Sequence, residues 1–573
     1  MTKPFTVLGI NHGGHDTSAA LMRDGELLAA CEQERYTLDK HSRRFPVEAI
    51  QGCFERADIR QDEVDEIAFA FQPLYHIREA YLRPALNDDE RIGVVIQDID
   101  RLSETYSTEE LVREKTNFVG KVEFYHHHQC HLASAWYPSG FDEAVVVSYD
   151  GIGEIETGLM AIGRSGLLDV VHNGARYPDS LGLLYSAITH YLGWRHHCDE
   201  GIVMGLASYG DPVAKIPGDG RSYYEVFEQI VQETGDYDYS IGRDWIDYHR
   251  VRDKWVSDRF CDVFGEKREM DGELTQHHKN LAAALQLRLE NLVLKQLERA
   301  RQQYDVNRLC LSGGVALNCS MNGKIEQSGI FDEIFVQPAS GDSGVAVGAC
   351  YLSHIAKGLK LEPNKMHDFY LGSRFSDEEI ESALEERGLS IEKSNDLMER
   401  TAARLADGKI IGWFQEGAEF GPRALGNRSI LTRPFPADMK DYLNNKVKFR
   451  EEFRPFAPAV LYEYSNKYFD ISQESPHMLI ACHATERAQK EIPATVHIDG
   501  TCRVQTVKAE NNKRFFKLLN AFFERTDCPV LLNTSFNVKG QPIVNTPLQA
   551  IDCYLSTSID CLIVGDYFVE KLH

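Results

Sequence analysis

The sequence of 573 residues has no uninterrupted apolar run close to the roughly 20 residues that a membrane-spanning helix needs. Cationic residues are also scarce, because 62 Lys and Arg stand against 87 Asp and Glu, a formal net charge of −25. A surface of this charge repels phosphate backbones and anionic lipid headgroups. These deficits argue against a membrane protein and against nucleic acid as the main partner.

Cysteine spacing excludes two further classes of protein. The 13 cysteines are odd in number and no two are spaced C-x-x-C. They therefore fit neither a disulfide framework nor a structural zinc site, and we expect reduced thiols in a cytoplasmic protein. A strand over residues 5–10 follows Met1 without the apolar region of a signal peptide, so secretion is not expected.

The length predicts several structural lobes, since a typical domain has about 150 residues. Apolar residues make up 43% of the chain and charged residues 26%, as in an ordinary globular protein. A polar stretch follows Lys357, and a new helical pattern begins at Asp377. We therefore predict an N-terminal domain over 1–358, a linker over 359–376 and a C-terminal domain over 377–573.

The N-terminal domain contains an apparent internal repeat. The order strand, polar loop, strand, turn and strand occurs once from Phe5 to Ala30 and again from Ala144 to Val171. A hairpin whose loop carries Asp, Gly and Ser, used once per lobe, is how two-lobed nucleotide-binding folds of the actin and sugar-kinase type bind phosphate. Two unrelated buried hairpins would produce the same pattern, and this alternative stays open.

Two later strand-to-helix loops suit a ligand site. A long helical pattern ends near Tyr304, and a strand over 308–311 leads into Gly313 and Gly314, where backbone can approach a ligand closely. The second loop, over 338–344, places Asp342 between glycines before a helix of small residues.

Two histidines have the spacing of a metal-binding pair. His127 and His131 are four residues apart, which places both imidazoles on one face of a helix. Asp150 opens the polar loop just downstream, and with Asp342 it completes a set of two nitrogen and two oxygen ligands. Such a set suits Fe(II), Mn(II) or Zn(II), and the residues do not choose among them.

The C-terminal domain contains a local excess of positive charge. Between Gly421 and Arg454 there are eight Lys or Arg residues and four acidic ones, in a chain that is otherwise acidic. The cations lie among phenylalanines and prolines, so this segment favours a rigid site for a small anionic ligand rather than a solvated surface.

Several motifs in fixed order resemble the O-carbamoyltransferases, the family of nodulation-factor, aminoglycoside, coumarin and ansamycin carbamoylating enzymes. The motifs lie between Val7 and Val569 at residues 9–20, 32–37, 127–131, 180–185, 204–210, 311–318 and 421–429. The resemblance implies an α/β protein with a two-lobed, actin-like (RNase H-like) N-terminal domain, related to the tRNA threonylcarbamoyladenosine-forming ATPases, and a YrdC-like C-terminal domain. It also implies that carbamoyl phosphate and ATP form carbamoyladenylate, whose carbamoyl group passes to an alcohol.

The resemblance also implies site residues. It places carbamoyl phosphate and the adenylate in the C-terminal domain on Arg423, Lys448, Arg454, Arg503, Asn533 and Ser535. In the N-terminal domain it places the nucleotide near Lys40, Gly313 and Gly314, and the metal on His127, His131, Asp150 and Asp342. His15 matches the general base for the acceptor hydroxyl. ATP with Mg²⁺, carbamoyl phosphate and a further divalent metal, with Fe²⁺ as first choice, are the expected cofactors.

Other interpretations remain at this stage. An actin-like ATPase or sugar kinase with an anion-binding regulatory domain would release ADP, and a tRNA-modifying enzyme would transfer to adenosine. We expect a small-molecule alcohol as acceptor, such as a natural product or sugar, and a monomer or homodimer. The extra histidines His126, His128, His196 and His197 are expected at the surface or beside the site. No motif identifies the acceptor.

Overall fold

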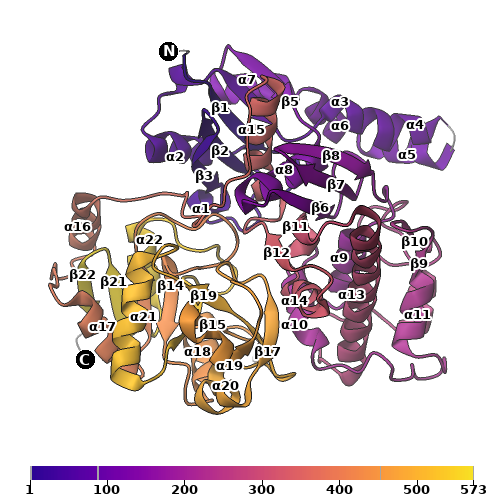
Figure 1. Cartoon of the computed structure of the whole chain (residues 1–573). Coiled ribbons are helices and arrows are strands. Elements are labelled where there is room, and N and C mark those ends of the chain that lie inside the picture. The colour runs from indigo at the N-terminus through magenta and orange to yellow at the C-terminus, as the bar shows by residue number, and fades with distance from the viewer. Residues whose placement is uncertain (1–2, 87–88, 452, 572–573) are drawn as a thin grey trace. The chain divides into compact units, whose positions relative to one another are not determined.

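The computed structural model describes residues 3–86, 89–451 and 453–571 (Figure 1). The chain forms two compact units. Unit 1 comprises Met1–Leu27, Arg43–Val47 and Arg60–Lys365, and unit 2 comprises Leu28–Ser42, Glu48–Ile59 and Met366–His573. Two short N-terminal segments therefore belong to the same unit as the C-terminal third of the chain, which a division into consecutive domains does not anticipate.

Two five-stranded sheets have the same topology, and all of their strands lie in unit 1 except β3, which starts in unit 1 and ends in unit 2. The first has the order β3-β2-β1-β4-β5 and the second the order β8-β7-β6-β11-β12. In each, an antiparallel hairpin continues into two strands that run parallel to its first strand. The repeated order confirms the internal repeat and the two-lobed α/β prediction. The bounds are β1 Thr6–Asn11, β2 Ser18–Arg23, β3 Glu26–Glu32, β4 Glu66–Phe69, β5 Lys121–Phe124, β6 Glu143–Tyr149, β7 Gly158–Arg164, β8 Leu167–His172, β11 Arg308–Ser312 and β12 Glu333–Val336.

Two buried helices pack against each other and against these sheets. Helix α15 (Val345–Ala356) contacts β1, β2 and β4, whereas α8 (His127–Ser139) contacts β6, β7 and β11. A Cβ atom at Gly348 of α15 would lie 1.8 Å from the carbonyl oxygen of Cys130 on α8. The helices therefore meet backbone to backbone, which only a residue without a side chain permits.

The polar loops of unit 1 follow the carboxyl ends of its strands. The loop with His15 follows β1, Asp150 follows β6, and Gly313 follows β11. Strands β6 and β11 are parallel neighbours, so their loops meet at one edge of the sheet. In α/β sheets ligands bind at this edge.

The remaining elements of unit 1 are mostly helices. Helix α13 begins at Gln276, where the Nδ1 of His278 accepts the backbone N–H of Thr275 at 3.0 Å and caps the first turn. Within the part of the chain that the structure describes, no helix is both long and apolar enough for a bilayer crossing. The elements are α3 Pro73–His76, α4 Arg83–Ala85, α5 Asp89–Gln97, α6 Ile99–Tyr106, α7 Thr108–Thr116, α9 Leu181–Tyr191, α10 Glu200–Ala207, α11 Tyr223–Ile230, β9 Val231–Glu233, β10 Tyr239–Ile241, α12 Asp258–Phe264, α13 Gln276–Tyr304 and α14 Cys319–Ser328.

Unit 2 is built on a seven-stranded sheet and a three-stranded sheet. The strand orders are β19-β15-β20-β14-β13-β21-β22 and β16-β17-β18. The strands are β13 Ile411–Phe414, β14 Arg428–Thr432, β15 Ala457–Leu461, β16 Phe469–Asp470, β17 Ala481–Ala484, β18 Thr501–Arg503, β19 Gln505–Val507, β20 Val530–Ser535, β21 Cys561–Val564 and β22 Tyr567–Glu570. The helices are α1 Glu34–Thr37, α2 Val47–Ala57, α16 Asp377–Glu386, α17 Leu397–Ala406, α18 Met439–Leu443, α19 Ser465–Tyr468, α20 Glu486–Glu491, α21 Lys513–Thr526 and α22 Pro547–Ser556.

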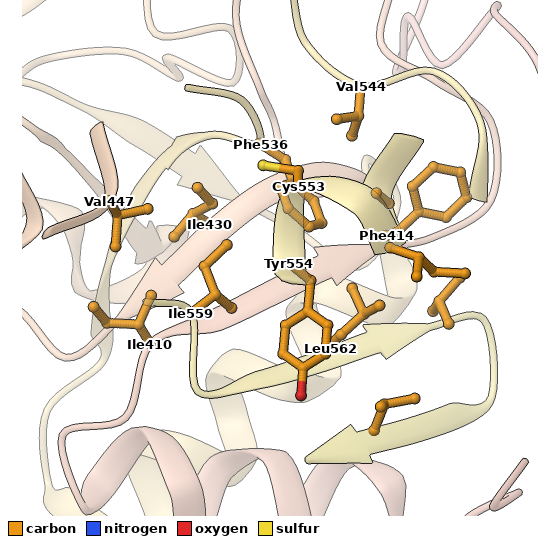
Figure 2. Close-up of a cluster of buried hydrophobic side chains, with 14 of the residues drawn as sticks. Ile410, Phe414, Ile430, Val447, Phe536, Val544, Cys553, Tyr554, Ile559 and Leu562 are labelled. Atoms are coloured by element: carbon orange, nitrogen blue, oxygen red, sulfur yellow. The ribbon is translucent and has the colours of Figure 1, made fainter. Parts of the chain in front are cut away.

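A buried apolar cluster lies between the seven-stranded sheet and its helices (Figure 2). Phe414, Ile430 and Leu562 come from three neighbouring strands, and Cys553 and Tyr554 come from α22. All 13 cysteines of the chain are free thiols, and most of them are buried, as expected from their spacing.

We predict that Gly348→Ala destabilises the protein strongly. The added methyl group would overlap the Cys130 carbonyl, and overpacking of this kind costs about 1–3 kcal/mol or more in free energy of unfolding. Urea denaturation followed by circular dichroism measures the change. Gly201→Ala is the matched control, because a Cβ at this helical glycine would meet no neighbouring atom within 4 Å, and it should leave stability equal or slightly higher. An unchanged midpoint for Gly348→Ala would contradict the close packing of α8 and α15.

Candidate functional site

The four predicted metal ligands lie together in unit 1. The Nε2 of His127 is 3.4 Å from Oδ2 of Asp150 and 3.5 Å from Oδ1 of Asp342, and the Nε2 of His131 is 3.6 and 3.8 Å from the same two atoms. These separations are long for hydrogen bonds, which are about 2.7–3.2 Å. They are close to the roughly 3–3.6 Å between ligand atoms around one ion with bonds of about 2.0–2.2 Å.

The electrostatics of this group favour a cation among the four side chains. Burial alone would lower the pKa of His127, but Asp150 and Asp342 raise it well above its usual value. Burial and Asp150 would raise the pKa of Asp342, yet the facing imidazoles bring it to about 2. The group thus combines two carboxylates, buried Asp150 and partly buried Asp342, with no Lys or Arg, and either a proton or a metal ion on the imidazoles would neutralise them.

Hydrogen bonds around the group orient its ligand atoms. The Nδ1–H of His127 donates to the carbonyl of Ala70 at 3.3 Å, which leaves Nε2 as the nitrogen with a free lone pair. Oε1 of Glu154, a fully buried residue, accepts the backbone N–H groups of His127 at 2.9 Å and of Gln72 at 2.8 Å. Glu154 therefore holds the first turn of α8, a role that its place in the sequence does not reveal.

The two glycines after β11 lie against Asp150. Gly313 has φ of 85°, and a Cβ there would lie 2.1 Å from the carbonyl oxygen of Tyr149. The backbone N–H of Gly314 donates to Oδ1 of Asp150 at 2.7 Å. Gly313 thus permits the close approach, and Gly314 fixes the carboxylate so that Oδ2 faces the imidazoles. A nucleotide contact of these glycines stays a prediction.

His15 lies in the polar loop between β1 and β2. Its Nδ1 is 2.9 Å from Oδ2 of Asp16, whose φ of 56° places it in the left-handed region of this turn. The His15 ring lies 5.6 Å from that of His197, measured between centroids. A Cβ at the adjacent Gly14 would be 3.3 Å from Oδ2 of Asp342, so the His15 loop passes beside the group of metal-type ligands.

The extra histidines differ in their environments. His128 is fully buried, with Nδ1 3.1 Å from Oγ of Ser148 and Nε2 2.7 Å from the carbonyl oxygen of Glu156, so it supports the loop after β6. His126 is partly buried, and its Nε2 lies 3.4 and 3.3 Å from carboxylate oxygens of Glu154 and Glu156. His196 and His197 are partly exposed beside His15.

A second group of predicted residues lies in unit 2. The Nζ of Lys448 donates to the carbonyl oxygen of Ser535 at 2.8 Å, to its Oγ at 3.1 Å and to the carbonyl oxygen of Asn537 at 2.9 Å. Burial first, and then Arg450, Arg454 and Lys40, lower the pKa of Lys448 well below its usual value.

More cations surround Lys448. Burial, with the charges of Arg454 and Arg503, lowers the pKa of Arg450 well below its usual value. The guanidinium of Arg450 lies 4.3 Å from the ring centroid of Phe456. Glu451 acts in the opposite direction and raises the pKa of Arg450, and its Oε2 is 3.6 Å from Nη1 of Arg454. This group of Lys448, Arg450, Arg454 and Arg503, which we call the cation cluster, has the character of an anion site. Sequence reasoning did not single out Arg450.

The structure places Lys40 in unit 2, near Lys448, and Gly313 and Gly314 in unit 1. Segment 28–42 also contacts the loop over 421–427. Oε2 of Glu32 accepts the backbone N–H of Gly421 at 3.2 Å, and the same oxygen accepts Nη2 of Arg35 at 3.0 Å. Arg35 in turn donates to the Gly421 carbonyl. This early segment therefore helps to shape the C-terminal site.

Hydrogen bonds to a buried glutamate stabilise the loop that carries Arg423. Oε1 of buried Glu419 accepts the backbone N–H groups of Leu425, Asn427 and Arg428 at 2.8, 2.8 and 3.1 Å. Asn533 donates from Nδ2 to the Ala424 carbonyl at 3.2 Å and to Oε1 of Gln505 at 2.8 Å. These bonds place Arg423 and Asn533 on adjoining segments of unit 2.

Two of the eight cations counted in the sequence have a structural role. Arg428 is fully buried and donates to the carbonyl oxygens of Ser373, Glu416 and Asn427 at 3.0–3.1 Å. Arg433 donates to the Ala406 carbonyl at 2.9 Å. The expectation that the whole charged segment serves an anionic ligand is therefore too broad, because these guanidinium groups satisfy backbone carbonyls.

Comparisons with known proteins cover both units. A family model described as "Carbamoyltransferase N-terminus" matches residues 6–351, and one described as "Carbamoyltransferase C-terminus" matches residues 402–571. The chain is 38% identical to the nodulation protein NolNO of Sinorhizobium fredii, over 97% of this chain and 79% of that protein. It is 31% identical to a 3'-hydroxymethylcephem-O-carbamoyltransferase of Amycolatopsis lactamdurans, over 70% of each chain.

Among solved structures, HypF of T. kodakarensis matches with a TM-score of 0.33 and 14% identity, over 63% of this chain and 49% of that one.

We predict that sulfate binds to the cation cluster and that its affinity falls as the pH rises from 6 to 9.5. Sulfate keeps its charge over this range, whereas Lys448 loses its proton well below the ordinary lysine value of about 10.4. Because the pKa of Lys448 is depressed, its positive charge is lost at a lower pH than that of an ordinary lysine. Sulfate binding therefore weakens correspondingly sooner as the pH rises. The measurement is the dissociation constant by isothermal titration calorimetry across the range.

Lys448→Arg is the matched variant for this measurement. Its guanidinium stays protonated throughout, so its pH profile should be flatter than that of the wild type. Identical profiles for the two proteins would contradict the role assigned to Lys448.

Proposed function

Because the chain belongs to the carbamoyltransferase family, we propose that it is an ATP-dependent O-carbamoyltransferase with a small-molecule alcohol as acceptor. In this proposal the C-terminal part forms carbamoyladenylate from carbamoyl phosphate and ATP, with release of pyrophosphate. The N-terminal part then transfers the carbamoyl group to the acceptor hydroxyl, and AMP leaves. The matches of both family models favour this function over a sugar kinase or a tRNA-modifying enzyme.

The cation cluster is the observation that carries the proposal. Burial and the charges of Arg450 and Arg454 lower the pKa of Lys448, and burial, Arg454 and Arg503 lower the pKa of Arg450, so an anion bound among these cations would stabilise the folded protein. Carbamoyl phosphate and the triphosphate of ATP are anions that fit this chemistry. Fixed guanidinium and ammonium groups also stabilise the charge that develops as pyrophosphate leaves.

The remaining predicted residues of unit 2 have positioning roles in this proposal. Ser535 is hydrogen-bonded to Lys448. Asn533 donates a hydrogen bond to Gln505, which is a residue of strand β19. Arg423 is carried by the loop that Glu419 holds rigid. A rigid loop keeps a guanidinium fork oriented toward a phosphoryl or carbonyl oxygen without further ordering on binding.

In unit 1 we propose that His127, His131, Asp150 and Asp342 hold a divalent metal ion. Their fit rests on the separations of the ligand atoms and on the donor set of two imidazoles and two carboxylates. Fe²⁺ is our first choice, with Mn²⁺ or Zn²⁺ as alternatives. When bound, such an ion supplies Lewis-acid stabilisation of a phosphate leaving group.

His15 is proposed as the general base. The hydrogen bond between Nδ1 and Asp16 orients the imidazole, and we assign to Nε2 the acceptance of the proton of the acceptor hydroxyl. Asp16 would also stabilise the imidazolium that forms when the proton arrives, as a carboxylate does in hydrolase triads. The alcohol oxygen then forms its bond to the carbamoyl carbon, and the bond from that carbon to the AMP oxygen breaks.

If adenylate formation and carbamoyl transfer take place in different parts of the chain, variants in the two parts should have different defects. Arg454→Ala should lower pyrophosphate release from ATP plus carbamoyl phosphate by about 10²-fold or more, because a cation at the charged intermediate is lost. His15→Ala should keep pyrophosphate release and lower carbamoyl transfer by about 10²–10⁴-fold, the usual contribution of a general base. Pyrophosphate is measured with a coupled assay and the carbamoylated alcohol by mass spectrometry.

His172→Gln serves as the control for His15, because His172 lies on β8 and pairs with Asp238 rather than with the site. It should leave both steps unchanged. Equal loss of pyrophosphate release in His15→Ala and Arg454→Ala would refute the assignment of the two steps to different parts of the chain.

For the metal ion, we predict about one equivalent of divalent transition metal per chain after purification, with loss of that metal in a His127→Ala, His131→Ala double variant. Inductively coupled plasma mass spectrometry measures the content. The His172→Gln variant should keep the full equivalent. Metal retained by the double variant, or none in the wild type, would show that the four residues serve another purpose.

A further inference from the structure

A second group of metal-type ligands lies in unit 1 and shares no residue with the four ligands described above. The Nε2 of His126 is 3.4 Å from Oε2 of Glu154 and 3.3 Å from Oε2 of Glu156. One ligand atom from each of the three residues lies within 4.8 Å of the other two. We call His126, Glu154 and Glu156 the second ligand group.

Local structure separates this group from the first one. His126 directly precedes α8 and has an extended backbone, with φ of −63° and ψ of 127°. Glu154 and Glu156 belong to the loop between β6 and β7, where both carboxylates are buried, and His126 is partly buried. The imidazole of His126 thus faces two glutamates, whereas that of its neighbour His127 faces two aspartates.

Each carboxylate of the second ligand group is anchored through its other oxygen. Oε1 of Glu156 accepts the hydroxyl of Tyr75 at 2.9 Å and Nη2 of Arg176 at 3.0 Å. Oε1 of Glu154 accepts two backbone N–H groups, one of them from His127 at 2.9 Å. The same backbone nitrogen lies 3.3 Å from Oε2 of Glu154, a weaker contact. These bonds hold both Oε2 atoms toward the imidazole, as hydrogen bonds to ligating carboxylates do at metal sites.

The spacing suits an ion between the three side chains better than a direct ion pair. Hydrogen bonds from a charged nitrogen to a carboxylate are about 2.7–2.9 Å long. The separations of 3.3 and 3.4 Å from His126 are longer. They agree with the roughly 3–3.6 Å between ligand atoms around one ion with bonds of about 2.0–2.2 Å.

The charges around the group also favour a cation. Arg176 pairs with Glu156 at 3.0 Å and offsets one of the two carboxylates. Within residues 3–86, 89–451 and 453–571, no Lys or Arg pairs with Glu154, which is fully buried. One buried negative charge is therefore left for the imidazole, or for an ion that the imidazole helps to bind, to offset.

We propose that the second ligand group binds a second divalent cation, of the Zn²⁺ or Mn²⁺ type, through Nε2 of His126 and the two Oε2 atoms. One imidazole with two carboxylates is a donor set that suits both ions, and three protein ligands leave a fourth position for water. Arg176 repels a cation at this place. We therefore expect weaker binding than at the four-ligand site, so that the ion is lost during purification and returns when it is added.

Occupancy of this site would reinforce the first one. Glu154 accepts the backbone N–H of His127 in the first turn of α8, so an ion on Glu154 fixes the turn that carries a proposed ligand of the first metal. The inference does not rest on the proposed function, because it needs only the ligand atoms of unit 1 and no turnover.

The test is isothermal titration calorimetry of Zn²⁺ into the whole chain at pH 7.5. We expect the wild type to bind one equivalent of Zn²⁺ beyond the metal that survives purification. Glu156→Gln, which keeps the shape of the side chain, and His126→Ala should each weaken this binding by at least about 10–100-fold, the usual cost of losing a residue that only supports a metal ligand. Circular dichroism checks that each variant is folded.

Two further variants locate the added ion. A His127→Ala, His131→Ala double variant removes the first site but keeps the backbone N–H that Glu154 accepts, and it should still bind one equivalent of added Zn²⁺. His172→Gln is the matched control. It removes a partly exposed imidazole that pairs with a single carboxylate, that of Asp238 at 3.1 Å, and it should leave the titration unchanged.

Three results would overturn the inference. Absence of Zn²⁺ binding by the wild type beyond its resident metal, or equal affinity in the wild type, Glu156→Gln and His126→Ala, would mean that His126 only forms an ion pair with the glutamates. Loss of the added equivalent in the double variant alone would mean that Zn²⁺ exchanges into the first site.

Discussion

Helices α8 and α15 meet backbone to backbone at Gly348, and the geometry of the N-terminal site depends on this approach. Each helix lies on a different sheet, so their contact joins the two lobes of unit 1. His127 opens α8, and Asp342 directly precedes α15. A side chain between the helices would move the two ends apart, and N···O separations of 3.4–3.8 Å would no longer hold. Packing at one glycine thus affects the positions of ligand atoms that both helices help to place.

The two units bring together groups of opposite charge, carboxylates in unit 1 and cations in unit 2. In unit 1 two carboxylates face two imidazoles, and a cation is what the group lacks. In unit 2 Arg450, Arg454 and Arg503 gather with Lys448, whereas Arg428 and Arg433 donate to backbone carbonyls. Unbalanced charge inside a protein is unfavourable unless a ligand offsets it. Both arrangements fit the ligands that we propose, a cation in unit 1 and anions in unit 2.

Some of the fold and site could be read from residue patterns. The repeated strand-loop-strand order appeared in the sequence because buried strands must be apolar and their loops polar, and the two equivalent sheets follow from it. The spacing of His127 and His131 indicated a shared helix face. In contrast, the sequence could not show that Glu154 caps α8 or that Arg450 joins the cation cluster, since a buried carboxylate and a surface one look alike in a sequence.

The sequence by itself determined the α/β class, the repeat, the family and the types of side chain available at each loop, because these depend on local periodicity and on motifs in fixed order. Only the tertiary structure decided which distant residues meet. It grouped Lys40 and Glu32 with the C-terminal unit, assigned Arg428 to backbone support, and brought His126 to Glu156. These outcomes depend on how far chain segments approach one another in space, and no local pattern records that distance.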